Sequence, residues 1–258
     1  MTEQNASRPE AGVWVRHARF ASWTAVLMAA AAAVALAVGA TTPPRSGPNC
    51  RGDCITYPYT AVARFVPRDY WWMYAAALMV VLFVGVVACL HHRAASDARL
   101  FTTIAVSLAT VSAAALLADY FVQLAVVQPS LLKGELAGLS LVSQYNPHGV
   151  FIALEDLGFL MMGLAFLFAS AALTGRSRLE RSARYVLLAG GILAVVALVV
   201  LAALYRSHLE YRYEVAAIVI DWLTLIVAGV LLAALFHRDA RASTAHGEDA
   251  QPRPSMPS

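Results

Sequence analysis

The chain has little charge and almost no lysine. Only 14% of its 258 residues are Asp, Glu, Lys or Arg, against roughly a quarter in soluble domains. With 60% hydrophobic residues and a mean hydropathy of +0.63, this composition excludes a disordered chain, a coiled coil and a secreted disulfide scaffold. Lys133 is the only lysine. It lies outside the apolar stretches, so a retinal-type Schiff base within a helix is excluded as well.

The histidine and glycine patterns of common membrane enzymes and nucleotide-binding proteins are also missing. Four histidines lie at the ends of apolar stretches and not inside them: His17, His91, His92 and His237. The stretches therefore offer no axial pair for haem b. Neither a His-Glu-x-x-His zinc motif nor a P-loop occurs. We expect no cofactor and no metal site.

Cysteine is scarce, with three residues in the chain. Cys50 and Cys54 are separated by three residues in a loop rich in Pro and Gly, and they are a disulfide candidate if that loop faces an oxidising compartment. Their spacing is not the Cys-x-x-Cys of thiol oxidoreductases. Cys89 lies in an apolar stretch, where a cysteine usually acts as a small core residue.

Long apolar stretches dominate what is present. A helix needs about 20 apolar residues to cross a hydrocarbon layer about 30 Å thick, and six stretches qualify: 22–40, 70–90, 100–127, 150–173, 185–205 and 215–236. The sequence therefore predicts an all-α bundle of six transmembrane helices over 22–236. An N-terminal segment, 1–21, precedes it and a disordered tail, 237–258, follows it. The first stretch is long enough to be a retained helix and not a signal peptide.

Arginine is unevenly distributed between the two sides of these stretches. The side with both chain ends carries more of it, so the positive-inside rule predicts that both termini are cytoplasmic and that the Cys50/Cys54 loop is outside. We expect a multi-pass protein of a bacterial inner membrane, with membrane lipids as its surroundings. The scattered arginines do not form the basic stripe that nucleic acid requires. No oligomeric state is predicted.

Four carboxyl groups interrupt the apolar stretches: Asp119, Glu155, Asp156 and Asp221. An aspartate near the centre of a spanning helix costs about 2.5–3.5 kcal/mol, so each calls for a reason. At a rise of about 1.5 Å per residue, all four lie roughly 8–12 Å below the predicted outer side. Because three separate helices bring acids to one depth, the sequence predicts a shared acidic pocket that opens outward, with these acids as its catalytic candidates.

Four neighbours of the acids are candidates for ligand binding. Gln123 follows Asp119 by four residues and shares its helix face, and Tyr120 is adjacent. His148 stands in a turn rich in Pro and Gly at the pocket mouth, and Trp222 follows Asp221.

Three interpretations of the acids remain open. They are structural glue if cations of the outer side pair with them, the candidates being Arg64, Arg68, Lys133, Arg206 and Arg212. They are a proton or cation site if the protein is a coupled carrier, although the inner halves of the stretches offer few ionisable residues. They form a pocket if the protein binds a small or lipid-like molecule, or if it is an acid-initiated enzyme such as an isoprenoid cyclase or isomerase.

The outer loops carry two further patterns. Aromatic residues crowd the start of the second stretch, as is typical of the headgroup region. Leu131, Leu132, Leu136 and Leu139 repeat with helical spacing and predict one short helix lying in the interface.

Several of these segments together resemble a group of bacterial integral membrane proteins. The resemblance is carried by Asp119–Gln123, Gln128–Glu135, Tyr145–Gly149 and Ala153–Gly158, and by Tyr57–Tyr59 and Arg68–Tyr70. It covers about the middle third of the chain. No activity is established for this group, so the resemblance implies a membrane fold and adds no function or site residue.

Overall fold

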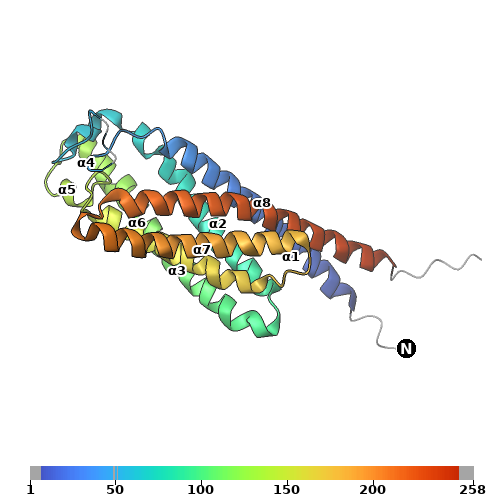
Figure 1. The fold of residues 1–258 in the computed structure, drawn as a ribbon. Coiled ribbons are helices and arrows are strands. Elements are labelled where there is room, and N and C mark those ends of the chain that lie inside the picture. The colour runs from blue at the N-terminus through green and yellow to red at the C-terminus, as the bar shows by residue number, and fades with distance from the viewer. Residues whose placement is uncertain (1–6, 49, 51, 250–258) are drawn as a thin grey trace, which may run out of the picture.

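Six long helices form one bundle in the computed structural model (Figure 1). The structure describes residues 7–48, 50 and 52–249. Within them, each of the six is long and apolar enough to span a membrane: α1 Ser7–Gly39, α2 Trp71–Arg93, α3 Arg99–Val122, α6 Val150–Ala169, α7 Arg178–Tyr205 and α8 Tyr211–Asp249. The predicted all-α bundle of six helices is confirmed.

The first and last helices are longer than the sequence predicted. α1 begins at Ser7, inside the predicted segment 1–21, and α8 continues to Asp249, through most of the predicted disordered tail. The remaining residues of that tail, 250–258, lie outside the described residues. Apolar periodicity marks only the part of a helix that crosses the bilayer. Beyond it, the Ala and Arg residues of α8 favour helix without leaving an apolar signal.

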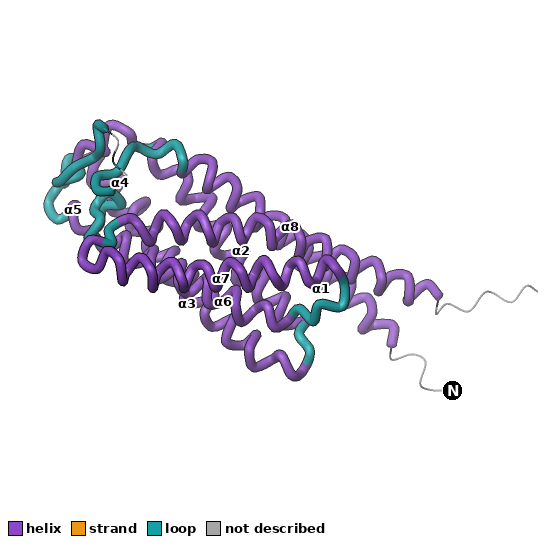
Figure 2. The backbone as a smooth tube through the Cα atoms, in the orientation of Figure 1, coloured by secondary structure: helices purple, strands orange, loops and turns teal. Residues whose placement is uncertain are grey.

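The two ends of the bundle differ in construction (Figure 2). The loop end holds residues 40–48 and 52–70, the short helices α4 Gln128–Lys133 and α5 Leu139–Val142, and the turn between α7 and α8. The terminal end holds the start of α1, the end of α8 and two tight connections, 94–98 and 170–177. The start of α1 and the end of α8 thus lie at one end of the bundle, in agreement with the predicted even number of spans.

The leucine repeat predicted one interfacial helix, but the structure has two short helices in this segment, so the prediction is wrong in the number of helices. α4 ends at Lys133 and α5 begins at Leu139. Gly134 and Gly138 flank the gap with φ angles of 74° and 76°, a left-handed conformation that interrupts a helix. Leu131 and Leu139 are buried, whereas the two leucines between them are exposed.

Helix packing follows two patterns around the bundle. α1 lies along α8 and α2, so the first and last helices of the chain are neighbours (Figure 1). On the other side, α6, α7 and α8 approach one another closely through glycine. A Cβ atom added at Gly191 of α7 would collide with the carbonyl oxygen of Gly163 in α6 and with Leu167. Small residues allow this approach, as is common between helices in membranes.

An ion-pair network closes the terminal end. The Arg93 guanidinium at the end of α2 donates to Glu180 of α7 at 3.0 Å and to Asp239 of α8 at 2.9 Å. Glu180 also accepts backbone N–H bonds from Thr174 and Arg176. Arg93 therefore links α2, α7 and α8 at this end, and Glu180 also links the connection 170–177 to α7.

We expect Gly191→Ala to lower the free energy of unfolding by about 1–3 kcal/mol, because the added methyl group overpacks the contact between α6 and α7. Unfolding of the purified protein in micelles, followed by circular dichroism, measures the change. Gly39→Ala is the matched control, since the nearest atom to its new methyl group is 3.9 Å away. Equal stability of the two variants would show that α6 and α7 do not approach this closely.

Candidate functional site

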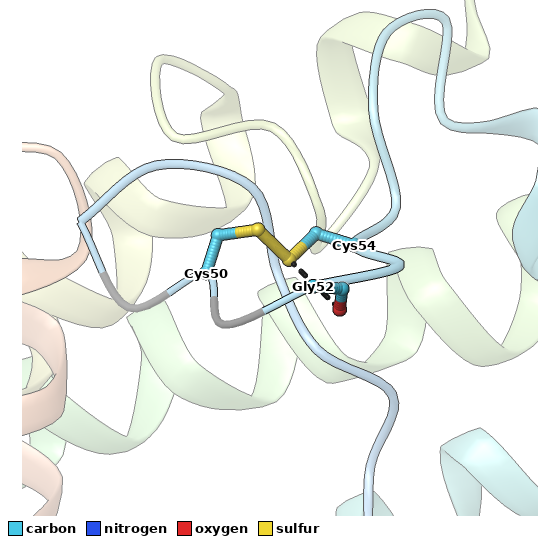
Figure 3. The surroundings of a disulfide bond; sticks show 3 residues. All are labelled: Cys50, Gly52 and Cys54. Atoms are coloured by element: carbon cyan, nitrogen blue, oxygen red, sulfur yellow. Dashed lines mark hydrogen bonds between the residues drawn. A yellow bond between two sulfur atoms is a disulfide. The ribbon is translucent and has the colours of Figure 1, made fainter.

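Arg45 is held in place by a short closed loop at the loop end. α1 ends at Gly39, and two prolines lead the chain to Arg45, which forms an isolated β-bridge with Ile55. The disulfide between Cys50 and Cys54, whose Cα atoms are 5.9 Å apart, closes the loop between the two bridge residues (Figure 3). Because Ile55 is 2% exposed, this loop is anchored to the core and carries Arg45 with it.

The Arg45 guanidinium forms a buried ion pair with Glu214. Its Nη1 donates to Oε1 of Glu214, in the first turn of α8, and the guanidinium lies 5.3 Å from the ring centre of Tyr211. The side chains are 16% and 0% exposed, respectively. The pair therefore joins the loop after α1 to the start of α8 inside the protein.

The charge on Arg45 is stabilised by more than one acid. Burial opposes charging of the guanidinium, but Glu214 and then Glu155 outweigh it and raise the pKa of Arg45 above its ordinary value. Asp69 and Asp119 also interact with it electrostatically. Arg45 is thus a permanent positive charge at the centre of several carboxyl groups.

Three carboxyl groups from three helices form what we call the acid group: Asp119 of α3, Glu155 of α6 and Glu214 of α8. Their exposed fractions are 1%, 0% and 0%, and all three interact electrostatically with one another and with Arg45. Glu155 also lies beside Tyr120, which is fully buried. The convergence expected from the sequence is present for Asp119 and Glu155.

Most oxygens of the acid group lack a hydrogen-bond partner. Oδ2 of Asp119, both carboxyl oxygens of Glu155 and Oε2 of Glu214 are buried and unpartnered. Glu155 approaches Glu214 and Tyr120, but not with the geometry of an ordinary hydrogen bond. Among the described residues, no three His, Cys, Asp or Glu side chains are arranged to hold a metal ion.

Asp156 and Asp221 lie to one side of the acid group. Asp156 is half-buried and interacts with Glu214. Asp221 is 0% exposed with both oxygens unpartnered, near Gly163 where α6, α7 and α8 converge. Tyr213 interacts with both aspartates. Asp221 therefore occupies its own position in the bundle, apart from the acid group.

Gln123 and His148 have local roles in the loop end. Gln123, where α3 passes into a π-helical turn over Gln123–Val127, donates from Nε2 to the carbonyl oxygen of Val142 at 2.5 Å. It thereby ties α3 to α5. His148 is exposed, and its backbone N–H donates to Asn146 Oδ1.

A buried hydrogen-bond network around Asp69 lies at the loop end. Asp69, 2% exposed, accepts hydrogen bonds on Oδ2 from Tyr145 Oη at 2.7 Å and from Gln144 Nε2 at 3.0 Å. Burial raises the pKa of the Tyr145 hydroxyl, so it remains a donor at neutral pH. These bonds hold the segment between α5 and α6 against the start of α2.

A groove of about 400 Å³ runs along α1 and α8 at the loop end. Its polar wall consists of Arg45 and Glu214, and Trp72 and Trp222 contribute indole rings. The remaining lining is almost entirely apolar: Leu36, Gly39, Ala40, Thr42, Pro44, Val215, Ile218 and Val219. Val215 and Val219 are 42% and 45% exposed, so the groove is open at the surface of the bundle. We call it the α1/α8 groove.

The groove and the acid group meet at Glu214. Of the residues proposed from the sequence, Trp222 lines the groove. Tyr120 lies behind it, with its ring centre 5.5 Å from that of Trp72. Asp119 and Glu155 lie behind Glu214 and are not part of the lining. A ligand in the groove therefore meets Arg45 first, with Glu214 directly behind it.

The fold and this site define a multi-pass membrane protein with a groove between its first and last spans and buried acids behind it. Comparisons with protein-family models, with curated proteins and with solved structures found no match to the chain.

Sequence reasoning missed the two residues at the centre of the site. Glu214 precedes Asp221 by seven residues, two helical turns, and so shares its side of α8. This spacing was the available signal, but the predicted span began one residue later, at Val215. Arg45 offered no comparable signal, because it lies in a loop. Within the described part of the chain, none of the ion pairs joins a cation proposed as a partner to Asp119, Glu155, Asp156 or Asp221. Arg64 stacks on Phe65, and Arg212 lies over Tyr205 and 3.9 Å from Glu210.

We expect Arg45→Gln to lower the free energy of unfolding in micelles by about 3–5 kcal/mol, because it leaves Glu214 buried without its cation. The double variant Arg45→Gln/Glu214→Gln should recover part of that loss. Arg64→Gln is the control and should change stability by less than about 1 kcal/mol, since Arg64 is exposed. Similar stability of the Arg45 and Arg64 variants would contradict a buried ion pair.

We also expect the disulfide to report the orientation of the protein. In a Cys89→Ser variant, a membrane-impermeant maleimide added to intact cells should label the protein only after treatment with a reductant, at Cys50 and Cys54. Mass spectrometry of the labelled peptides measures the result. Labelling that requires permeabilised cells would place the loop end in the cytoplasm and overturn the predicted orientation.

Proposed function

We propose that this protein binds a small, lipid-like molecule in the α1/α8 groove, with the head of the molecule at Arg45 and Glu214. The observation that carries the proposal is the shape and lining of the groove: a polar pair at its wall and an apolar surface along two spanning helices. Binding sites are mostly apolar concave surfaces with a few polar groups that fix orientation. An amphiphile matches both parts of this lining.

The position of the groove favours a ligand that arrives from the membrane. Its rim is formed by exposed valines of a spanning helix, so an apolar tail can enter sideways without crossing water. The polar pair lies at the loop end, at the level where a headgroup would lie. Arg45 is 16% exposed and its partner Glu214 is 0% exposed, so the guanidinium is the charge of the pair that is accessible from the groove.

An acid-initiated enzyme acting on an isoprenoid-like substrate is the second candidate. One observation favours it: Glu155 has a fully buried carboxyl group with both oxygens unpartnered, beside Tyr120. A buried carboxylic acid can act as a general acid. Glu155 does not line the groove, however, so binding beside the Arg45–Glu214 pair requires fewer assumptions.

A coupled carrier is supported less well than either. A carrier needs a polar path to both sides of the membrane. At the terminal end, Glu180 and Asp239 are held by Arg93 in a closed network.

We expect Val219→Trp to reduce photolabelling by an alkyl diazirine probe about tenfold, equivalent to about 1.4 kcal/mol of binding free energy, because the indole fills the groove. Labelling of the purified protein in micelles, mapped to α1 and α8 by mass spectrometry, measures the effect. Val227→Trp is the matched control: Val227 lies on the same helix, is 46% exposed against 45% for Val219, and is not part of the groove lining.

The two substitutions add the same side chain to α8 at equally exposed positions. Any change in how the probe partitions into the micelle is therefore the same for both variants and does not affect their comparison. Equal labelling of the two variants would mean that the probe does not occupy the groove, and the proposed function would then be wrong.

A further inference from the structure

We infer that the α1/α8 groove selects a single-chain amphiphile with a carboxylate head, which binds to the Arg45 guanidinium. This inference rests on the proposed function and specifies the chemistry of its ligand. Its starting point is the charge that a ligand in the groove can reach. The Arg45 side chain is 16% exposed, whereas that of its partner Glu214 is 0% exposed, so the accessible charge of the groove wall is positive.

The Arg45 guanidinium has donors that the protein does not use. A guanidinium carries five N–H groups in a planar fork. Among residues 7–48, 50 and 52–249, its one side-chain hydrogen bond runs from Nη1 to Oε1 of Glu214. Asp119 and Glu155 also attract Arg45, but they lie behind Glu214 and accept no hydrogen bond from it. The other N–H groups of this groove-lining residue are therefore without an acceptor in the described part of the chain.

Arg93, at the opposite end of the bundle, shows how an arginine of this chain fills such donors. Its Nη1 donates to Glu180 at 3.0 Å, and its Nε donates to Asp239 at 2.9 Å. The first of these carboxylates is 4% exposed and the second is 40% exposed. Arg45 repeats the first half of this arrangement, with Nη1 on the buried Glu214, and has no counterpart of Asp239 among the described residues. A ligand carboxylate takes the place of that second, accessible acid.

The chemistry of Arg45 also ranks the other head groups. A carboxylate accepts charge-assisted hydrogen bonds from a guanidinium and matches its planar fork. A hydroxyl accepts a weaker, neutral bond, and an ammonium group, which has donors only, is repelled by the guanidinium. A phosphodiester is an anion as well, but it is tetrahedral and carries a substituent on each side. Because only 16% of the Arg45 side chain is exposed, the site favours the smaller, planar head.

The volume and lining of the groove favour one alkyl chain. At about 400 Å³, the groove lies near the lower end of the range of roughly 300–1,000 Å³ that is typical of ligand sites. Leu36 of α1 and Ile218 of α8 belong to its apolar lining, and the exposed Val215 and Val219 leave it open at the surface of the bundle. A single chain therefore fits this groove better than the two chains of a phospholipid.

The inference is tested by changing only the head of the ligand. Dodecanoate, dodecanol and dodecyltrimethylammonium share one alkyl chain. Each competes with the alkyl diazirine probe for the full-length protein in uncharged maltoside micelles at mildly alkaline pH, where the carboxylate is ionised. The signal that remains in Val219→Trp is subtracted as background. We expect dodecanoate to compete about tenfold more effectively than either of the others, because it alone gains a charge-assisted hydrogen bond to Arg45.

Two variants assign the effect to one cation. Arg45→Gln/Glu214→Gln removes the guanidinium together with its buried partner, so that neither is left without the other, and dodecanoate should then lose its advantage over dodecanol. Arg64→Gln removes an exposed arginine from the same end of the bundle and should leave the advantage unchanged. Partition of each competitor into the micelle is the same for both variants. The comparison of heads on the unmodified protein decides the matter even if the double variant folds poorly.

A fourth competitor separates a carboxylate from anionic heads in general. Lysophosphatidylglycerol with the same chain length carries one acyl chain and a phosphodiester. Weaker competition by this lipid than by dodecanoate supports a carboxylate head. Equal or stronger competition would show that the groove accepts a phospholipid headgroup, and the choice of a carboxylate would be overturned.

The two proposals fail differently. If dodecanol or dodecyltrimethylammonium competes as well as dodecanoate, or if dodecanoate keeps its advantage in the folded double variant, selection for a carboxylate is wrong and binding in the groove stands. If probe labelling is the same in Val219→Trp and Val227→Trp, the groove is not a binding site and both proposals fall.

Discussion

The ion pair between Arg45 and Glu214 is the interaction on which the loop end depends. It joins a loop that follows the first helix to the first turn of the last helix, and it lies at the contact between the groove and the acid group. Neither partner is stable in this environment alone, since burying an unpaired charge costs several kcal/mol. The disulfide loop and the bridge to Ile55 hold the backbone of Arg45 in position for this ion pair.

The two ends of the bundle use arginine in opposite ways. At the terminal end, Arg93 has two acidic partners, and Glu180 is further satisfied by backbone N–H groups. At the loop end, Arg45 has more carboxyl groups around it than it can pair, and several of their oxygens remain without hydrogen bonds. The first arrangement is that of a structural clamp. The second leaves hydrogen-bonding capacity unused inside the protein.

The fold was predictable from the sequence because bilayer thickness imposes a length on each apolar stretch, and six stretches meet it. Asp119 and Glu155 were predictable as a buried pair because an acid within such a stretch is costly in lipid and therefore faces the interior of the bundle. Arg45 was not, since a loop has no periodicity to indicate where its side chains point. The polar extension of α8 beyond residue 237 was missed for a related reason: outside the bilayer, a helix needs no apolar residues.

The packing of α1 against α8 has a consequence for how the protein is made. Four other spans lie between them in the sequence, so the two walls of the groove are synthesised well apart in time. Arg45 leaves the ribosome long before Glu214 exists, and the two can pair only after α8 has been made. The site is therefore completed when α8 inserts, and a chain synthesised only as far as α7 lacks one wall of the groove.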